Sequence, residues 1–355
     1  MKDIMLHRFP NNEYIMYNEL ISLYPWETIG YSSEEKPIVY ASIGSGERDI
    51  CIWAGMHGNE TTGIHIILEL LHEFQLKQWL NSEFKLHCIP VINPDAYVRY
   101  TRRNGMGIDL NRDFRAFQTI ESAKLIGWIR SINPELCFNL HDQRTIFHVH
   151  GTSAFTSLLV PSAEKSQKIT PLRRALMNRL GNALKQSEND LVGVGRYTDK
   201  YYPTAVGDYL MSSNIPNILI ESGVSSGDMS RIKAREFGVE IIQKTLLATD
   251  EHCEVYDQLP LNEKGQLEWV ITDVLYANMR IDVGLKRVEA MNGHVKASIY
   301  MVDDLGDLAA RPRLYEIDGK DIVLGEVLMV DRPITADFGS VTFEDGKVIA
   351  GQLKE

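Results

Sequence analysis

The chain has 355 residues, 44% of them hydrophobic and 24% charged, a composition typical of a globular protein with a large core and long enough for two domains. Its formal net charge of -11 creates no field that attracts phosphate backbones, and Lys and Arg gather only in pairs such as Arg102-Arg103. Nucleic acid is therefore excluded as an expected partner.

The N-terminal stretch "MKDIMLHRFPNNEY" carries charges and a proline where a signal peptide needs an uninterrupted apolar segment. No later stretch reaches the apolar length that spans a bilayer. We therefore expect a soluble, cytoplasmic protein without a membrane partner. The four cysteines form no CxxC pair, and three of them lie in apolar, strand-like runs, so buried reduced thiols are expected.

Strand and helix patterns alternate along the first part of the chain. "PIVYASIGSGERDICIWAG" predicts two strands joined by a Gly-Ser-Gly-Glu turn, that is, a hairpin. Apolar residues at helical spacing then predict a helix from Thr61 to about Trp79. The strand "FKLHCIPVIN" follows, then a long polar loop from Pro94 to about Phe117, a helix from about Ile120 to Ile132, and the strand "ELCFNLH".

The same alternation continues through "SLLVP", a helix from about Pro171 to Gln186, another around Gly207 to Ser212, the strand "PNILIES" and a helix from about Arg231 to Ala248. This order predicts an α/β fold whose mixed, mostly parallel sheet is flanked by helices on both faces.

The pattern changes beyond about Glu251. From Leu267 onward, short alternating segments such as "LEWVITDVLYA" and "KDIVLGEVLMV" are separated by turns such as "IDGK", with almost no helical periodicity. We therefore predict an α/β domain over residues 1–250 and a small all-β domain over residues 251–355.

Polar residues follow several of the predicted strands directly: "MHGNE", "NPD", "HD" and "ESG". Ligands bind at the carboxyl ends of the strands in an open α/β sheet. These side chains are therefore expected to meet at one edge of the sheet.

His57 and Glu60 are three residues apart at the entry to a helix, a spacing that lets an imidazole and a carboxylate share one cation. A catalytic zinc site needs a third protein ligand and leaves a fourth position for water. His141 directly follows the strand "LCFNL" and is the third ligand we predict. His148 and His150, which alternate along one strand, are a weaker second candidate.

The loop "TRRNGMGIDLNRDF", residues 101–114, joins three arginines and two asparagines in an otherwise acidic protein. Guanidinium groups bind carboxylates with two parallel hydrogen bonds, so the loop is interpreted as an anion-binding element. Glu221 follows a wholly apolar run, where a carboxylate is costly unless it is exposed, paired or next to a metal.

Over roughly residues 37 to 250 the chain resembles the zinc carboxypeptidases of the M14 metallopeptidase family. The resemblance rests on four ordered motifs: "HGNE", "NPDAY" with "TRRNGMGIDLNRDF", "NLHD" and "ILIESG". The resemblance implies one zinc ion held by His57, Glu60 and His141. It also implies roles for five further residues: Glu221 as general base and acid, Arg102 at the scissile carbonyl, Asn111 and Arg112 on the terminal carboxylate of the substrate, and Asp109 orienting His57.

The sequence departs from the family in ways that leave the substrate open. A signal and propeptide are not expected, "NPDAY" stands where "NPDG" is commoner, and either Tyr201 or Tyr202 is the candidate to cap the substrate. The loop "RRNGMGIDLNR" is similar to the bacterial branch that trims peptidoglycan peptides. By contrast, "GMHGNET" and the appended β domain resemble the succinylglutamate desuccinylase and aspartoacylase branch.

The leading hypothesis is a cytoplasmic metallocarboxypeptidase that hydrolyses the C-terminal amide bond of a small peptide. The alternatives are an N-acyl-amino-acid amidohydrolase of the second branch and a non-catalytic binding protein that kept the fold. The sequence does not indicate the oligomeric state or the role of the β domain.

Overall fold

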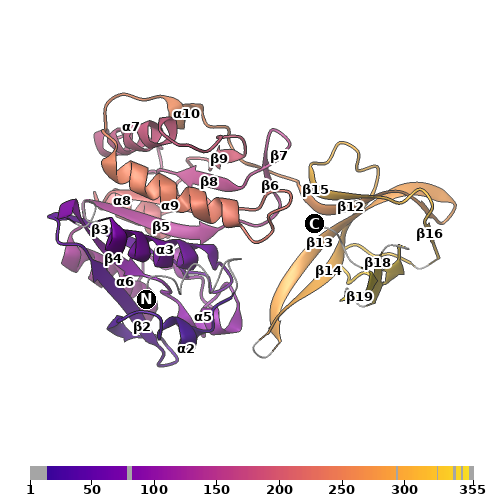
Figure 1. The fold of residues 1–355 in the computed structure, drawn as a ribbon, viewed down its shortest axis with the longest axis horizontal. Helices are drawn as coiled ribbons and strands as arrows, with labels where there is room; N and C mark the ends of the chain where they lie inside the picture. Colours follow the sequence, from indigo (N-terminus) through magenta and orange to yellow (C-terminus); the bar gives the residue numbers. More distant parts are fainter. Residues whose placement is uncertain are drawn as a thin grey trace. The chain divides into compact units, whose positions relative to one another are not determined.

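The computed structural model describes residues 14–77, 82–292, 295–325, 327–338, 341–344 and 347–351. These residues form two compact units (Figure 1). The first unit combines the chain up to Gln143 with Phe155–Gly223 and Ser230–Leu261. The second unit combines Arg144–Ala154, Val224–Met229 and the chain from Asn262. The first two segments of the second unit come from within residues 1–250, and residues 251–261 belong to the first unit. The two units therefore do not coincide with the two domains expected on either side of residue 250.

The first unit is built on an eight-stranded sheet whose strands follow the order β1-β2-β4-β3-β5-β10-β8-β9. Parallel pairs join β4, β3, β5 and β10 in the middle of the sheet, as well as β8 and β9, and the remaining pairs are antiparallel. The predicted mixed α/β sheet is therefore confirmed. The strands are β1 (Glu27–Tyr31), β2 (Pro37–Ile43), β3 (Arg48–Trp53), β4 (Phe84–Ile89), β5 (Leu136–Asp142), β8 (Thr156–Leu159), β9 (Val194–Arg196) and β10 (Asn217–Ser222).

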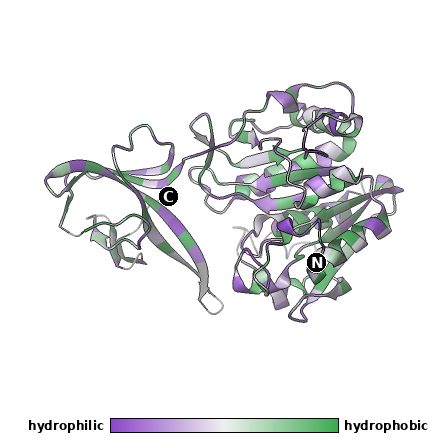
Figure 2. Ribbon diagram, turned by 180° about the vertical axis from the view of Figure 1, so that it is seen from behind, coloured by the Kyte–Doolittle hydropathy of each residue, from purple (hydrophilic) through white to green (hydrophobic). Residues whose placement is uncertain are grey.

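Helices pack against both faces of this sheet. One apolar core joins the sheet to α3 (Thr62–Leu76), α7 (Pro171–Lys185) and α9 (Ile232–Leu247). A second core joins it to α6 (Ile120–Ile132) and α8 (Val206–Ser212). The last four residues of β3, residues 50–53, alternate between these cores and are fully buried, which is typical of a strand covered on both faces. Hydrophobic residues, green in Figure 2, accordingly run through the sheet. Short helices α2 (Tyr17–Leu20) and α10 (Val255–Gln258) complete the unit.

The predicted hairpin over residues 37–55 is wrong. Strands β2 and β3 do not pair with each other, because β4 lies between them and pairs with both. The glycines of the connecting segment serve a different purpose from a tight turn. A Cβ atom on Gly44 would lie 2.2 Å from the Phe84 carbonyl oxygen, and one on Gly46 would lie 2.0 Å from the Glu83 carbonyl carbon. These glycines let the start of β4 approach the backbone.

The polar loop predicted from Pro94 to Phe117 also contains regular structure. It begins with α5 (Pro94–Arg99) and includes a 3-10 helix, Leu110–Arg112. Helix α5 forms because Asn93 caps it, accepting from the Ala96 N–H at 3.2 Å, and because Pro94 occupies its first turn. Among the other predicted helices, α6 has the expected bounds and α7, α8 and α9 differ by one residue at their ends. The predicted end of the first helix, about Trp79, lies outside the described residues.

The second unit is made of β-strands, as the sequence predicts for the C-terminal region. Its largest sheet has the order β14-β13-β12-β15, with β16 also paired to β12. These strands are β12 (Leu267–Tyr276), β13 (Met279–Asn292), β14 (Val295–Gly306), β15 (Arg313–Asp318) and β16 (Val323–Leu324). A three-stranded sheet contains β11 (Glu263–Lys264), β6 (Phe147–Val149) and β7 (Thr152–Ser153). Another contains β17 (Ala336–Asp337), β18 (Val341–Glu344) and β19 (Lys347–Gly351).

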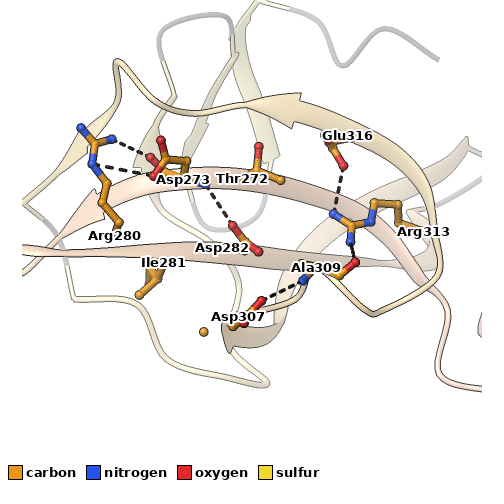
Figure 3. Close-up of a pocket in the computed structure, with 10 residues that line it drawn as sticks. Thr272, Asp273, Arg280, Ile281, Asp282, Asp307, Ala309, Arg313 and Glu316 are labelled. Atoms are coloured by element: carbon orange, nitrogen blue, oxygen red, sulfur yellow. Dashed lines mark hydrogen bonds and ion pairs between the residues drawn. The ribbon is translucent and has the colours of Figure 1, made fainter.

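An open pocket of about 620 Å³ lies within the second unit (Figure 3). Its charged side chains are already paired inside the unit. Arg313 contacts Glu316 at 2.9 Å and donates to two backbone carbonyls, and both carboxylate oxygens of Asp282 accept backbone N–H groups. None of the predicted site residues lines this pocket. Its polar groups therefore stabilise the loops around it.

The four cysteines are buried and none forms a disulfide, as expected from their positions in apolar runs. No helix in the described part of the chain is both long and apolar enough to cross a membrane.

Candidate metal centre

His57 and Glu60 lie in the segment between β3 and α3, held in place by close backbone packing. A Cβ atom on Gly58 would lie 2.0 Å from the Ala96 carbonyl carbon, so only glycine lets this segment lie against α5. The Gly58 N–H donates to the Thr101 carbonyl at 2.8 Å. Asn93 Nδ2 donates to the Met56 carbonyl at 3.0 Å. The α5 region thus fixes the backbone that carries both side chains.

His141 and Glu221 come from neighbouring strands at the middle of the sheet. In the parallel pairing of β5 with β10, Glu221 is the register partner of His141. Paired residues of adjacent strands point to the same face of a sheet. The structure therefore brings the carboxylate of Glu221 to the side on which His141 faces His57 and Glu60.

His57, Glu60 and His141 form a cluster whose potential ligand atoms all lie within 4.8 Å of one another. Glu60 Oε1 is 2.8 Å from His57 Nδ1, and Glu60 Oε2 is 2.7 Å from His141 Nδ1. The two Nδ1 atoms are 3.2 Å apart. Both imidazoles are buried, so water does not separate these groups. Two imidazole nitrogens and one carboxylate are a donor set that zinc prefers.

Asp109 determines which nitrogen of His57 faces this cluster. Its Oδ1 lies 3.0 Å from His57 Nε2, and the same oxygen accepts the Asn111 N–H at 3.0 Å. A carboxylate at Nε2 favours the tautomer that carries its proton there, which leaves the Nδ1 lone pair directed at Glu60 and His141. A lone pair facing a carboxylate is unfavourable unless a proton or a metal cation lies between them. The residues present therefore fit a bound zinc ion.

The electrostatics of the cluster also favour positive charge. Burial of the His57 ring acts to lower its pKa, but the charge of Glu60 and the hydrogen bond to Asp109 outweigh burial and raise the pKa to about 9. Burial acts to raise the pKa of Glu60, whereas the charges of His57 and His141 hold it well below its usual range. Opposed charges that share a buried site stabilise each other in this way.

Glu221 has the opposite environment. Burial, followed by the charge of Glu60, raises the pKa of Glu221 well above its usual range. A carboxylate with a raised pKa takes up a proton more readily near neutral pH. The side chain thus has the chemistry of a proton acceptor beside the cluster.

Arg102, Asn111 and Arg112 lie around the same centre. Arg102 Nε donates to Asp109 Oδ2 at 3.0 Å, and Arg102 Nη1 lies 3.3 Å from Glu60 Oε1, while 45% of the Arg102 side chain stays exposed. Asn111 Oδ1 accepts the Val206 N–H at 2.9 Å. The Arg112 guanidinium is exposed and lies 5.6 Å from the centre of the Tyr202 ring. Two guanidinium groups are therefore available to an anion.

The sequence also offered Tyr201 or Tyr202 as the residue that caps the substrate, and His148 and His150 as a second ligand candidate. Of the tyrosine pair, Tyr202 is the one whose ring lies by Arg112, although the capping role itself stays a prediction. His148 and His150 belong to a segment of the second unit. Among the described residues, no metal-binding cluster of histidine, cysteine and carboxylate side chains includes either of them.

Asp142 is a site residue to which the sequence analysis assigned no role. It follows His141 and is buried, and its Oδ2 accepts from the Thr61 N–H at 3.0 Å and from the Thr62 N–H at 3.1 Å and hydroxyl at 3.0 Å. These bonds join the end of β5 to the start of α3, the two elements next to the cluster. The motif "NLHD", which places a carboxylate next to the predicted ligand His141 at the end of a strand, was the available signal.

Asp208 provides a test of the electrostatics near Arg112. The carboxylate is 6% exposed and accepts the Tyr202 N–H at 3.0 Å, and burial raises its pKa to about 6. Because the folded-state pKa lies above the ordinary value of 3.8, the folded state binds the proton more tightly than the unfolded state. Ionised Asp208 therefore destabilises the protein above about pH 6. That cost disappears as the pH falls towards 3.8.

We expect Asp208→Asn to increase the free energy of unfolding at pH 8 by up to about 3 kcal/mol and to have no stabilising effect at pH 4. Urea unfolding of both proteins at pH 4, 6 and 8 measures this difference. A gain of equal size at pH 4 and pH 8 would contradict the assigned cause.

Comparisons with known proteins concern first the fold and then the sequence. A metallo-carboxypeptidase from Burkholderia cenocepacia superimposes with a TM-score of 0.53 at 15% identity, covering 64% of this chain and 66% of that chain. A metallo-carboxypeptidase from Pseudomonas aeruginosa, solved in complex with (2-guanidinoethylmercapto)succinic acid, gives a TM-score of 0.52 at 17% identity, covering 65% and 66%. The fold is thus that of the metallo-carboxypeptidases.

Residues 16–125 match the family model described as zinc carboxypeptidase, peptidase M14, which confirms the resemblance that the motifs indicate. Human carboxypeptidase D is 27% identical over 174 residues, which cover 39% of this chain and 12% of that protein. The catalytic chain of rat carboxypeptidase N is 25% identical over 166 residues, or 34% of each chain. The chain thus spans about an eighth to a third of the length of these curated relatives.

Proposed function

We propose that this protein is a zinc-dependent metallocarboxypeptidase that hydrolyses the C-terminal amide bond of a small peptide. The observation that supports it most is the cluster of His57, Glu60 and His141, with the exposed Arg102 guanidinium 3.3 Å from Glu60 and with Glu221 as the register partner of His141. The matched zinc carboxypeptidase family supports the same activity. The expected stoichiometry is one zinc ion per chain.

Each proposed role follows from the chemistry of one side chain. Zinc bound by His57, Glu60 and His141 supplies Lewis acidity, which polarises a carbonyl group and acidifies water to a pKa of about 7. Glu221 accepts the proton of the attacking water and delivers it to the leaving amine, because its raised pKa suits both transfers. Arg102 stabilises the negative charge that develops on the carbonyl oxygen in the transition state.

Asn111 and Arg112 bind the terminal carboxylate of the substrate. Arg112 is exposed, and its Nη1 donates to the Asn111 carbonyl at 2.7 Å, which leaves the other edge of the guanidinium for a carboxylate. The Asn111 side chain uses its oxygen to accept from Val206, so its amide NH₂ points away from that bond and is the group that donates to substrate. A peptide without a free C-terminal carboxylate lacks the charge that these residues recognise.

We expect zinc-loaded protein to release C-terminal residues from short peptides and to leave the same peptides with an amidated C-terminus intact. Steady-state rates over a peptide panel, with N-acetyl and N-succinyl amino acids alongside, measure this preference. (2-guanidinoethylmercapto)succinic acid, bound by the similar Pseudomonas enzyme, is a suitable competitor. Wild-type release no faster than that of Glu221→Gln protein would refute the proposal, and hydrolysis of acylated amino acids in preference to all peptides would establish the amidohydrolase alternative instead.

The second unit is the feature that supports the amidohydrolase alternative, because the desuccinylase and aspartoacylase branch also has an appended β domain. The trimming of cell-wall peptides and a cytoplasmic location stay predictions, as does the absence of nucleic-acid and membrane partners.

A further inference from the structure

Arg173 is a charged side chain that the proposed reaction does not use, yet it is fully buried. It lies in the first turn of α7, after the cap residue Thr170, and its relative exposure is 0%. A buried guanidinium is strongly unfavourable unless its donors are paired. Its partners therefore indicate what it stabilises.

Three groups surround the guanidinium. Nε donates to the Val160 carbonyl at 3.1 Å, and Nη1 donates to the Gln167 carbonyl at 3.2 Å. Nη2 forms an ion pair with Asp199 Oδ1 at 2.9 Å. Two of these contacts fix the arginine to nearby backbone, whereas the third reaches the irregular segment 197–205 between β9 and α8. Asp199 is one anchor of this segment, beside the Tyr197 N–H, which donates to the Leu158 carbonyl at 3.1 Å, and the Ser162 hydroxyl, which donates to the Asp199 carbonyl at 3.1 Å.

Segment 197–205 carries Tyr201 and Tyr202 and is connected to the carboxylate-binding residues. The Thr204 carbonyl accepts the Phe114 N–H at 3.1 Å, two residues beyond Arg112. Directly after the segment, the Val206 N–H donates to Asn111. The Tyr202 ring lies 5.6 Å from the Arg112 guanidinium. Because residues 198–205 belong to no strand or helix, individual contacts such as these determine where the segment lies.

We propose that Arg173 is a positioning residue, which through Asp199 holds segment 197–205 against Asn111 and Arg112 and so sets the affinity for the substrate. This inference rests on the proposed function for its consequence in catalysis. The residue lies away from the cluster of His57, Glu60 and His141, so its loss affects substrate binding and leaves the chemical step unchanged. KM rises and kcat is preserved.

Asp199→Asn is the informative variant, because it removes the ion pair and leaves both backbone hydrogen bonds of Arg173 in place. Its side chain is 31% exposed, so part of the replacing amide reaches water, and we expect the fold to be retained. We expect a KM about five- to tenfold higher, with kcat within about twofold of wild type. Arg173→Met should show the larger effect of the same kind. Arg174→Met is the matched control, since the neighbouring Arg174 forms a half-exposed pair with Asp257 at 2.7 Å.

Hydrogen exchange of the backbone amides provides a readout that needs no activity. Faster exchange at residues 197–205 in Asp199→Asn, and not in Arg174→Met, supports the anchoring role even if wild-type protein releases no residue and the proposed function fails. Unchanged exchange in this segment, or a loss confined to kcat, would overturn the inference. If Arg173→Met does not fold, hydrogen exchange and kinetics of Asp199→Asn test the inference without it.

Discussion

Glu221→Gln is expected to lower kcat/KM for a cleaved peptide by about 10³-fold while zinc content stays at the wild-type level. A general base contributes roughly 10²- to 10⁴-fold, and glutamine has nearly the shape of glutamate but cannot accept the proton. Glu221 is the register partner of His141 and is not one of the three clustered ligands, so the metal donor set stays complete. The substitution should therefore lower the rate of peptide hydrolysis and leave zinc binding unchanged.

Rate measurements and metal analysis on the same preparation test this prediction. Glu47→Gln is a suitable control, because it makes the same chemical change at an exposed residue in the segment between β2 and β3. Loss of zinc together with activity would assign Glu221 to metal binding. Full activity with full zinc would remove it from the mechanism.

The helices and the strand order of the sheet differ in how well the sequence predicts them. A helix is defined by contacts three and four residues apart, so apolar spacing alone placed α6 with its correct bounds. Strand pairing is decided by residues far apart in the chain. The short Gly-Ser-Gly-Glu link predicted a hairpin of β2 and β3, but the apolar strand β4 inserts between them. No local pattern contains that information.

The site shows the same contrast. His57, Glu60 and His141 were predictable because they lie at or shortly beyond the ends of β5 and β3, and the ends of parallel strands meet at one edge. The contacts of Arg173 were not predictable, since it pairs with Asp199 and with the carbonyls of Val160 and Gln167, which only the folded chain brings together. The mixed origin of the second unit was missed for a similar reason. Val224 and Met229 belong to its core although they follow the strand that carries Glu221.

Removal of zinc, by chelation or by His141→Ala, is expected to abolish hydrolysis and to destabilise the folded protein. A ligand that binds only the folded state stabilises it by about 4 kcal/mol at a free concentration 1,000 times its Kd. Without a cation, the Nδ1 atoms of His57 and His141 lie 3.2 Å apart on either side of a buried carboxylate. The wild-type protein should therefore lose thermal stability in a chelator, whereas His141→Ala, which lacks a ligand, should respond much less.

His148→Ala is the matched control for this experiment, because His148 is also buried, at 8% exposure, and was the competing ligand candidate. It should bind one zinc ion per chain and keep the full response to chelator. Zinc content by elemental analysis and thermal unfolding with and without chelator give both quantities. Zinc loss in His148→Ala would move the metal site to the second histidine pair. A wild-type protein that binds no stoichiometric zinc, with unfolding unchanged by chelator, would favour a non-catalytic binding protein, since the reaction proposed for Glu221 and Arg102 depends on the ion held beside them.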